Sequence, residues 1–173
     1  MASRITRVIA TVTLAIALLA LATSTDIIAG TKDAEAKKYT EQLQKSKDPK
    51  VRAAAIEKIG ELAQINKKLG EAAVADIKIA LKDKDVGVRK AAAKAYGCCD
   101  PDDSEAVASL IDLLKNDRED SVKMNAALGL QAMGEKAKTA VPEMRIAAKS
   151  MKNDRDTKAL NQIAKSISGI KKN

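Results

Sequence analysis

Acidic and basic side chains recur along this chain in pairs with a fixed spacing, and they are the residues best placed to do chemistry. The members of each pair are four residues apart, so they lie on one helix face and can form an ion pair or hold a charged partner together. The three pairs are Asp48 with Arg52, Asp85 with Arg89, and Glu119 with Lys123. Because an active site seldom recurs in every repeat of a protein, this recurrence predicts a structural role rather than catalysis.

Most side chains of familiar active sites are missing. The chain has no His, Trp or Phe, and its two tyrosines are Tyr39 and Tyr96. This composition excludes a His general base, a Ser-His or Cys-His nucleophile pair and a His-containing metal site. It also excludes an aromatic platform on which single-stranded bases could stack. The sequence therefore predicts a protein that is not an enzyme and that uses no cofactor.

Two further groups of residues carry metal-binding atoms, and neither has the pattern of a metal site. Cys98 and Cys99 are adjacent thiols with no His to complete a ligand set, so we interpret them as one buried thiol and one at a helix end. A strained disulfide between them, formed in an oxidising compartment, is the alternative. An acidic group precedes a predicted helix, where carboxylates cap free N–H groups, and it lacks the spacing and glycine of an EF-hand. It comprises Asp100, Asp102, Asp103 and Glu105.

The paired charges belong to a motif that occurs three times. Each copy is centred on a Val, with an acid three residues before it, a base one residue after it, and apolar residues four, five and eight after it. The central residues are Val51, Val88 and Val122, so the copies are 37 and 34 residues apart. A period in this range indicates a stacked array of helix pairs.

The apolar spacing of the array is helical, and no alternating run of strand type interrupts it. Antiparallel helix pairs are predicted over residues 33–46 with 49–65, 71–82 with 86–98, 103–115 with 119–133, and 139–152 with 155–169. The corresponding repeats span about 33–69, 70–101, 102–136 and 137–171. The last repeat lacks the Val-Arg pair, as a terminal cap does. The predicted fold is an all-α, right-handed α-solenoid of about four helix pairs, in one domain over residues 31–173.

Two prolines and an acid predict where helices begin. Asp48 is expected to cap a helix whose first residue is Pro49, because the missing N–H of proline costs nothing there. Pro142 is expected in another first turn, after the break at Gly134. These residues place helix starts independently of the apolar spacing.

Beyond the paired charges, the copies share small residues and glycines at fixed places. They read Asp48, Val51, Arg52, Ala55 and Gly60, then Asp85, Val88, Arg89, Ala92 and Gly97, and in weaker form Glu119, Val122, Lys123 and Ala126, followed by the segment from Gly134 to Pro142. With these residues the chain resembles the HEAT-like repeats grouped with the phycobiliprotein-lyase type, over roughly residues 33–170. The resemblance implies that the paired acids and bases link successive repeats in a hydrogen-bonded ladder, and that the second helices line a concave surface. The family includes scaffolds, adaptors, DNA-repair proteins and chromophore lyases, so the resemblance specifies a fold rather than a function.

The outward face of the second helices is the predicted binding surface. With 100° per residue, the core positions leave the residues two and six after each Val facing away. Those positions hold Ala53 and Glu57, then Lys90 and Lys94, then Met124 and Leu128. A basic patch beside an apolar one is typical of a protein-binding site. The alternative for Leu128 is packing on the next repeat.

The first 30 residues have the layout of a secretory signal. Arg4 and Arg7 precede an uncharged run over residues 8–25 that is rich in Ala, Leu, Ile and Val. An uncleaved membrane anchor over residues 5–25 is the alternative, because the run reaches the ~18 residues of a short span. Both interpretations place the repeats outside the cytoplasm, in the periplasm or secreted. Loss of this segment removes two arginines and one aspartate, which lowers the net charge from +8 to +7.

Together these features predict a non-catalytic extracytoplasmic scaffold that binds a protein or peptide on its concave face. The basic charge supports a second hypothesis, a binder of an anionic polymer or of the lipid headgroups of a membrane surface. A third, a relic of a chromophore lyase, rests on the resemblance alone. Predicted secretion makes DNA an unlikely partner. Salt separates the first two hypotheses, since a steep loss of affinity with salt is typical of polyanion binding.

Overall fold

The computed structural model describes residues 30–99 and 103–170. The chain divides into two compact units, residues 1–35 and residues 36–173. In the first unit the described residues are 30–35, which begin a helix that runs over 30–45. The predicted signal or anchor segment therefore lies almost entirely outside the described residues. None of the helices in the described part of the chain is long and apolar enough to cross a membrane.

Every regular element of the described residues is a helix, as predicted. After the first helix the order is α2 Pro49–Ile65, α3 Lys68–Glu71, α4 Val74–Ala80, α5 Val86–Cys98, α6 Asp103–Asn116, α7 Asp120–Met133, η1 Gly134–Ala140, α8 Val141–Lys149 and α9 Asp154–Ser168. The second helices α2, α5, α7 and α9 follow the predicted ranges to within a residue or two. All-helical structure with this order confirms the predicted α-solenoid class.

The first helices depart from prediction in two places. The single helix expected over residues 71–82 is divided into α3 and α4, which a turn separates. Where one helix was expected over residues 139–152, the 3-10 helix η1 leads directly into α8, which ends at Lys149. Gly134, at the start of η1, has a φ of 63°, a backbone conformation that glycine adopts at low cost. The break expected at Gly134 is therefore a change of helix type.

Helices α2 and α5 begin where side chains accept hydrogen bonds from free N–H groups. Asp48 accepts from the Lys50 N–H at 2.9 Å, and Pro49 is the first helical residue after it, as predicted. Asp85 accepts from the Val88 N–H at 3.1 Å and starts α5 in the same way. Such caps satisfy donors that have no partner within the helix. Each cap places the arginine that follows it on the first turn of its helix.

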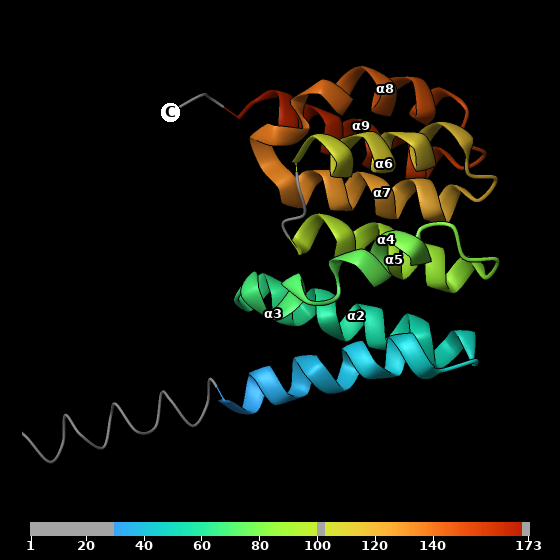
Figure 1. Ribbon diagram of the computed structural model, residues 1–173. Coiled ribbons are helices and arrows are strands. Elements are labelled where there is room, and N and C mark those ends of the chain that lie inside the picture. Colours follow the sequence, from blue (N-terminus) through green and yellow to red (C-terminus); the bar gives the residue numbers. More distant parts are fainter. Residues whose placement is uncertain (1–29, 100–102, 171–173) are drawn as a thin grey trace, which may run out of the picture. The chain divides into compact units, whose positions relative to one another are not determined.

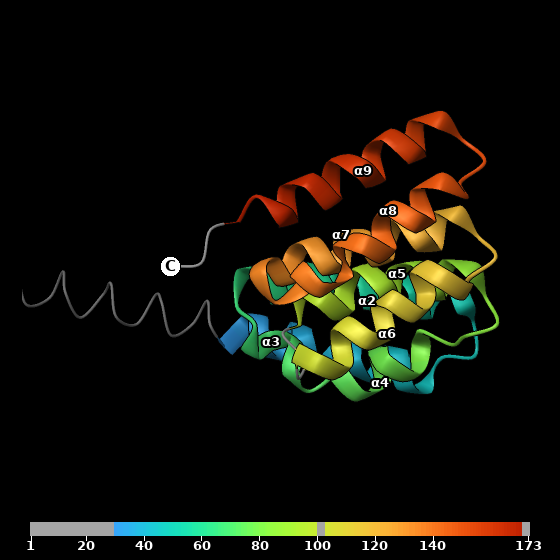
Figure 2. The ribbon, with the colours of Figure 1, turned by 90° about the horizontal axis from the view of Figure 1, so that it is seen from above.

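Helices α2, α5 and α7 are stacked closely, because small residues meet between them. A Cβ atom on Gly97 of α5 would overlap the Gly129 carbonyl of α7. A Cβ atom on Gly60 of α2 would lie 2.9 Å from the Cβ of Ala95 on α5. The views agree on this arrangement within the second unit, where α4 and α6 lie on one side and α2, α5 and α7 form a layer behind them (Figures 1 and 2). These two sides are called the first-helix face and the second-helix face below.

The core follows the repeated motif, with one exception. Val88 and Val122 are fully buried, as are the apolar residues that follow them in the motif. Val51, at the same motif position, remains 38% exposed. In the described part of the chain no complete repeat precedes Val51, so the packing partner that covers the later valines is missing there. The core therefore runs through the layer between the two faces.

Candidate binding surfaces

A ladder of charged side chains joins the turns of successive repeats. Arg52 donates to Asp83 at 2.8 Å and to the Lys47 carbonyl at 3.0 Å. Arg89 donates through Nε to Asp117 at 2.8 Å and through Nη1 to the Asp83 carbonyl at 3.0 Å. Each arginine therefore donates to backbone carbonyls of the turn before its own helix and to a carboxylate of the turn in the next repeat. This is the inter-repeat ladder that the family resemblance implies.

The acids of the ladder are different from the ones predicted. Asp48 and Asp85 cap their own helices, and the carboxylates that receive the arginines come from the next repeat's turn, at Asp83 and Asp117. Asp83 and Asp117 stand two residues before the motif acids of their repeats, and each also accepts the backbone N–H of that acid, at 2.9 and 3.0 Å. The sequence signal for them is an acid two residues before Asp85 and another two residues before Glu119.

The third charge pair does not form a rung of the same kind. Glu119 is exposed and its side chain makes no cap bond to α7. The Nζ atom of Lys123 lies 3.6 Å from Oδ1 of Asp120, a residue of the same helix. Asp120 accepts the backbone N–H of Lys152 at 3.0 Å, and this bond reaches the turn of the fourth repeat. At these turns the third and fourth repeats are therefore linked through Asp120 rather than through Lys123.

The ladder carboxylates are held in their charged form. Partial burial alone would raise the pKa of Asp83, but hydrogen bonds from the Asp85 N–H and from Arg52 more than offset this and lower it. The same balance lowers the pKa of Asp117, where the bonds come from Arg89 and the Glu119 N–H. The hydrogen bond to Asp117 raises the pKa of Arg89 against partial burial, which lowers it. Charge in this ladder is thus paired within the protein, which is what a structural role requires.

A hollow opens on the second-helix face and spans three successive second helices. Its volume is about 270 Å³, and its floor consists of the small residues Gly60, Ala91 and Ala95. Polar side chains surround this floor: Glu57, Glu61 and Gln64 from α2, Lys94 and Cys98 from α5, and Asn125 from α7. The close stacking of α2 on α5 leaves small residues between the helices, and the longer side chains of both helices form the walls.

Two of the predicted binding residues, Glu57 and Lys94, line this hollow. Lys90, one turn before Lys94, is exposed outside the lining. Met124 and Leu128 are half-buried and pack against the core. The expected apolar patch therefore belongs mostly to the packing of α7, which is the alternative that the sequence left open for Leu128. The hollow's remaining polar residues Glu61, Gln64 and Asn125 were not predicted from the sequence.

The cysteines are free thiols in the structure. Cys98 borders the hollow, where its sulfur donates to the Lys94 carbonyl at 3.5 Å and accepts from the Gln64 amide at 3.6 Å. Cys99 is fully buried, and burial, with a smaller effect of the neighbouring Cys98, raises its pKa to about 12. A thiol with such a pKa is almost entirely protonated near neutral pH and is a poor nucleophile.

Of the four acids predicted at the start of α6, Glu105 is the one whose side chain the structure describes. Asp100 and Asp102 lie outside the described residues, and so does the side chain of Asp103. Glu105 pairs with Lys78 of the preceding first helix. Among the described residues, no three His, Cys, Asp or Glu side chains lie close enough to hold a metal ion.

The repeats, their ladder and their stacked second helices define a class of helical-repeat protein. The sequence model of HEAT repeats matches residues 36–131 and 77–168, which together include most of the chain. The chain therefore belongs to the HEAT-repeat family. No curated protein matches the sequence significantly. Proteins built from HEAT repeats generally act as scaffolds for protein interactions.

Proposed function

We propose that this chain is a non-catalytic scaffold outside the cytoplasm, and that it holds an extended protein segment in the hollow of its second-helix face. The observation that carries the proposal is the lining of this hollow by polar side chains from three successive repeats. A segment that crosses the stacked helices meets a new side chain at each repeat, so the array supplies specificity along its length. The missing His, Trp and Phe support a binding role rather than catalysis.

The chemistry of the hollow suggests what the segment contains. Glu57 and Glu61 place two carboxylates on the α2 wall, of which Glu61 already pairs with Lys58 at 2.7 Å, while Lys94 places an ammonium group on the α5 wall. A basic side chain of the partner fits the first wall and an acidic one fits the second. Gln64 and Asn125 add amide groups, which can donate to or accept from a peptide backbone. The small floor lets that backbone come close to the helices.

Binding to an anionic polymer is the competing hypothesis, and the hollow argues against it as the main function. The net charge of the chain is +8, which favours polyanions in general. Two of the three charged side chains that line the hollow are carboxylates, however. A polyanion would therefore have to bind elsewhere on the surface. Among the described residues, none provides support for the chromophore-lyase hypothesis.

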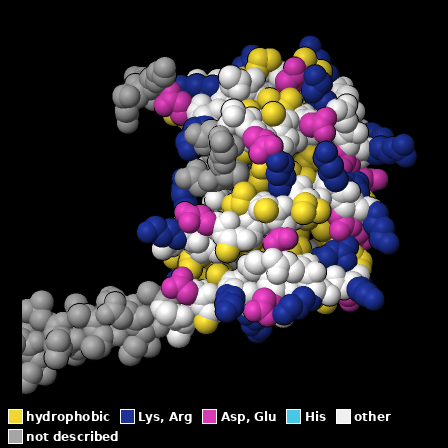
Figure 3. Space-filling view, viewed as in Figure 1, with side chains coloured by type: hydrophobic (Ala, Val, Ile, Leu, Met, Phe, Trp, Pro, Cys, Tyr) yellow, Lys and Arg dark blue, Asp and Glu magenta, His cyan; other side chains and the backbone are white. Residues whose placement is uncertain are grey.

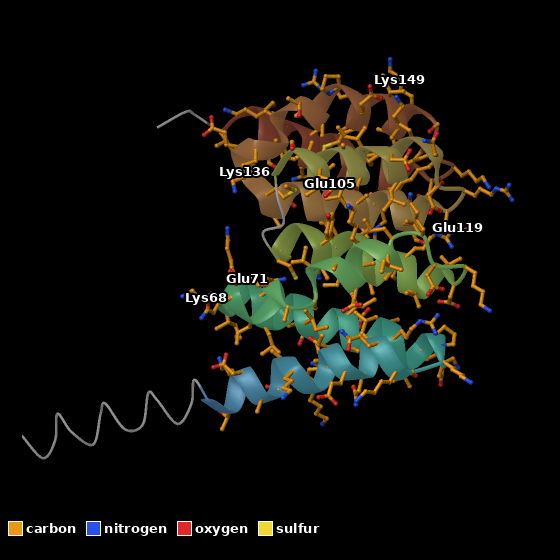
Figure 4. All side chains as sticks on the ribbon, in the orientation of Figure 1. Lys68, Glu71, Glu105, Glu119, Lys136 and Lys149 are labelled. Atoms are coloured by element: carbon orange, nitrogen blue, oxygen red, sulfur yellow. The ribbon has the colours of Figure 1, made fainter. Side chains whose placement is uncertain are left out.

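Crosslinking in the compartment where the protein accumulates, followed by mass spectrometry, tests the proposal. We expect crosslinked partner peptides at positions in and around the hollow. In a binding assay with the captured partner, Glu57→Lys combined with Lys94→Glu should weaken binding more than tenfold, because both charged walls are reversed. A matched control is Glu71→Lys combined with Lys149→Glu, which reverses the same charges at exposed positions outside the lining of the hollow (Figure 4).

Two outcomes would refute the proposal. If the control weakens binding as much as the hollow variant, only the general surface charge matters. If affinity falls steeply with salt and neither variant is selective, the partner is a polyanion that binds the surface as a whole.

A further inference from the structure

The first-helix face carries an apolar groove between α4 and α6. The most exposed large hydrophobic side chain of the described residues, Ile79, stands on its α4 rim with 74% of its surface exposed. Leu81 and Leu113, which are nearly buried, form its floor, and Ala75 and Ala108 add small side chains to its walls. The groove has a volume of about 620 Å³. Figure 3 shows hydrophobic side chains gathered over the middle of this face, between charged ones.

The groove follows from how the two layers pack. Helices α2, α5 and α7 meet through glycines and alanines and lie close together. Helix α4 has only seven residues and packs on α5, while α6 packs on α5, α7 and α8. A space therefore remains between α4 and α6. A second apolar hollow of about 510 Å³ continues this surface on the other side of α6, where it is lined by Val107 and Ile111 and shares Ala108 with the groove.

Charges of opposite sign stand on the two walls of the groove. The α4 side carries Lys78 and Lys82, and the α6 side carries Glu105 and Asp112. Lys78 and Glu105 form an ion pair from one wall to the other. Lys82 and Asp112 are both exposed, and no ion pair joins them in the described part of the chain. Asp112 accepts one hydrogen bond, from the Asn116 amide at 2.6 Å, and no cationic side chain among the described residues pairs with its charge. Lys82 and Asp112 can therefore each pair with an opposite charge of a partner.

We propose that this groove is the contact surface for a second copy of the same chain. A two-fold axis that runs along the groove places the α4 wall of each copy opposite the α6 wall of its partner. The basic wall then faces the acidic wall twice, so the charge pattern is complementary to itself. The small side chains of Ala75 and Ala108 leave room beside the groove floor, and the exposed Ile79 of the other copy fills it. An exposed apolar patch with a charged rim is a frequent protein-binding surface.

This dimer does not depend on the proposed scaffold function. The groove lies on the first-helix face, while the hollow lined by Glu57 and Lys94 lies on the second-helix face. A dimer formed through the grooves leaves both hollows open. Failure of one proposal therefore says nothing about the other.

Sedimentation velocity of the chain, purified in the form in which the cell accumulates it, tests the dimer from about 1 μM to about 1 mM. We expect a concentration-dependent dimer that Ile79→Asp weakens at least tenfold, because a central apolar anchor carries much of an interface's affinity. Ile65→Asp is the matched control, since Ile65 is also largely exposed, at 62%, and lies outside the groove. Both variants keep the same N-terminal segment, so association through that segment would be equal in the two.

Charge reversal provides the sharper test of the two-fold arrangement. Lys82→Glu and Asp112→Lys should each weaken the dimer, because each brings like charges together across the axis. The combined variant should recover most of the affinity, because the reversed charges again face opposite ones. Thermal melts must stay unchanged in all variants, and Lys82 and Asp112 are exposed enough to expect this. A monomer over the whole concentration range, equal loss from the Ile65 control, or no recovery in the combined variant would overturn the proposal.

Discussion

Removing the guanidinium of Arg89 is expected to destabilise the protein by about 2–3 kcal/mol, less than the 3–5 kcal/mol typical of fully buried pairs. Arg89 reaches Asp117 with two donors, at 2.8 and 3.2 Å, and the two side chains are only 17% and 5% exposed. Arg89→Ala would leave the Asp117 carboxylate nearly buried, with the Glu119 N–H as its remaining hydrogen-bond donor among the described residues. We expect a smaller cost than for a fully buried pair because the Arg89 side chain keeps 17% of its surface exposed.

A double-mutant cycle with Arg89→Ala and Asp117→Ala in urea unfolding measures this interaction. The coupling free energy between the two side chains should exceed about 1 kcal/mol, because they form one bidentate contact. The exposed pair of Lys45 and Glu41 is the control, and its coupling should stay below about 0.5 kcal/mol. A coupling for Arg89 and Asp117 no larger than this control would refute the role of the ladder in joining repeats.

The stabilisation that the pair of Arg89 and Asp117 provides should decrease at low pH. The folded-state pKa of Asp117 is lowered, so its contribution to stability is present above the pKa of the unfolded carboxyl group and is lost as pH falls through the folded-state pKa. The cost of Arg89→Ala should therefore be full near neutral pH and should shrink below about pH 4. A cost that is unchanged at low pH would mean that packing, rather than the ion pair, explains it.

Three further predictions follow from burial and from the N-terminal sequence. Val88→Asp should lower the free energy of unfolding by several kcal/mol because Val88 is fully buried. Lys90 is exposed, so Lys90→Asp should change it by no more than about 0.5 kcal/mol. Equal losses of stability in denaturant melts would contradict the helical register. Cys99 should resist thiol reagents in the native protein near neutral pH, because its pKa is raised to about 12, and rapid labelling of Cys99 would contradict its burial. The exported protein should lose roughly 22–36 residues by intact mass, and a full-length chain in the soluble cytoplasm would contradict secretion.

The array was predictable because the residues that recur with its period are apolar and must be buried. Val88 and Val122 recur with apolar residues at four, five and eight positions after them, and that spacing places them on one helix face. The start of α2 was predictable from the chemistry of Asp48 and Pro49, which acts within one turn of the chain. Local spacing was therefore sufficient for the helices and for most of the core.

The ladder acids were missed because their role depends on the next repeat. Pairing Asp85 with Arg89 assumes that partners lie four residues apart on one helix, but the arginine side chain is long enough to reach the following turn at Asp117. Asp85 is already occupied by the Val88 N–H. Sequence separation along one helix cannot show which of two nearby carboxylates a long side chain reaches.

The binding surfaces were only partly predictable for a related reason. A helical wheel placed Leu128 outward, yet it packs against the core because neighbouring helices cover part of that face. The groove beside Ile79 depends on the space between α4 and α6, which no single helix determines. Glu57 and Lys94, which the helical wheel also placed outward, do line the hollow.

Site-specific crosslinking tests whether a protein segment binds in the hollow of the second-helix face. A photoreactive residue placed at Gln64, within the hollow, should capture a partner protein in the native compartment. The same residue placed at Lys149, at the exposed end of α8, should capture none or different proteins. We expect one dominant partner at Gln64, whose capture is lost when Glu57→Lys and Lys94→Glu are combined. Equal capture from both positions, or capture that the combined variant leaves unchanged, would contradict binding in the hollow.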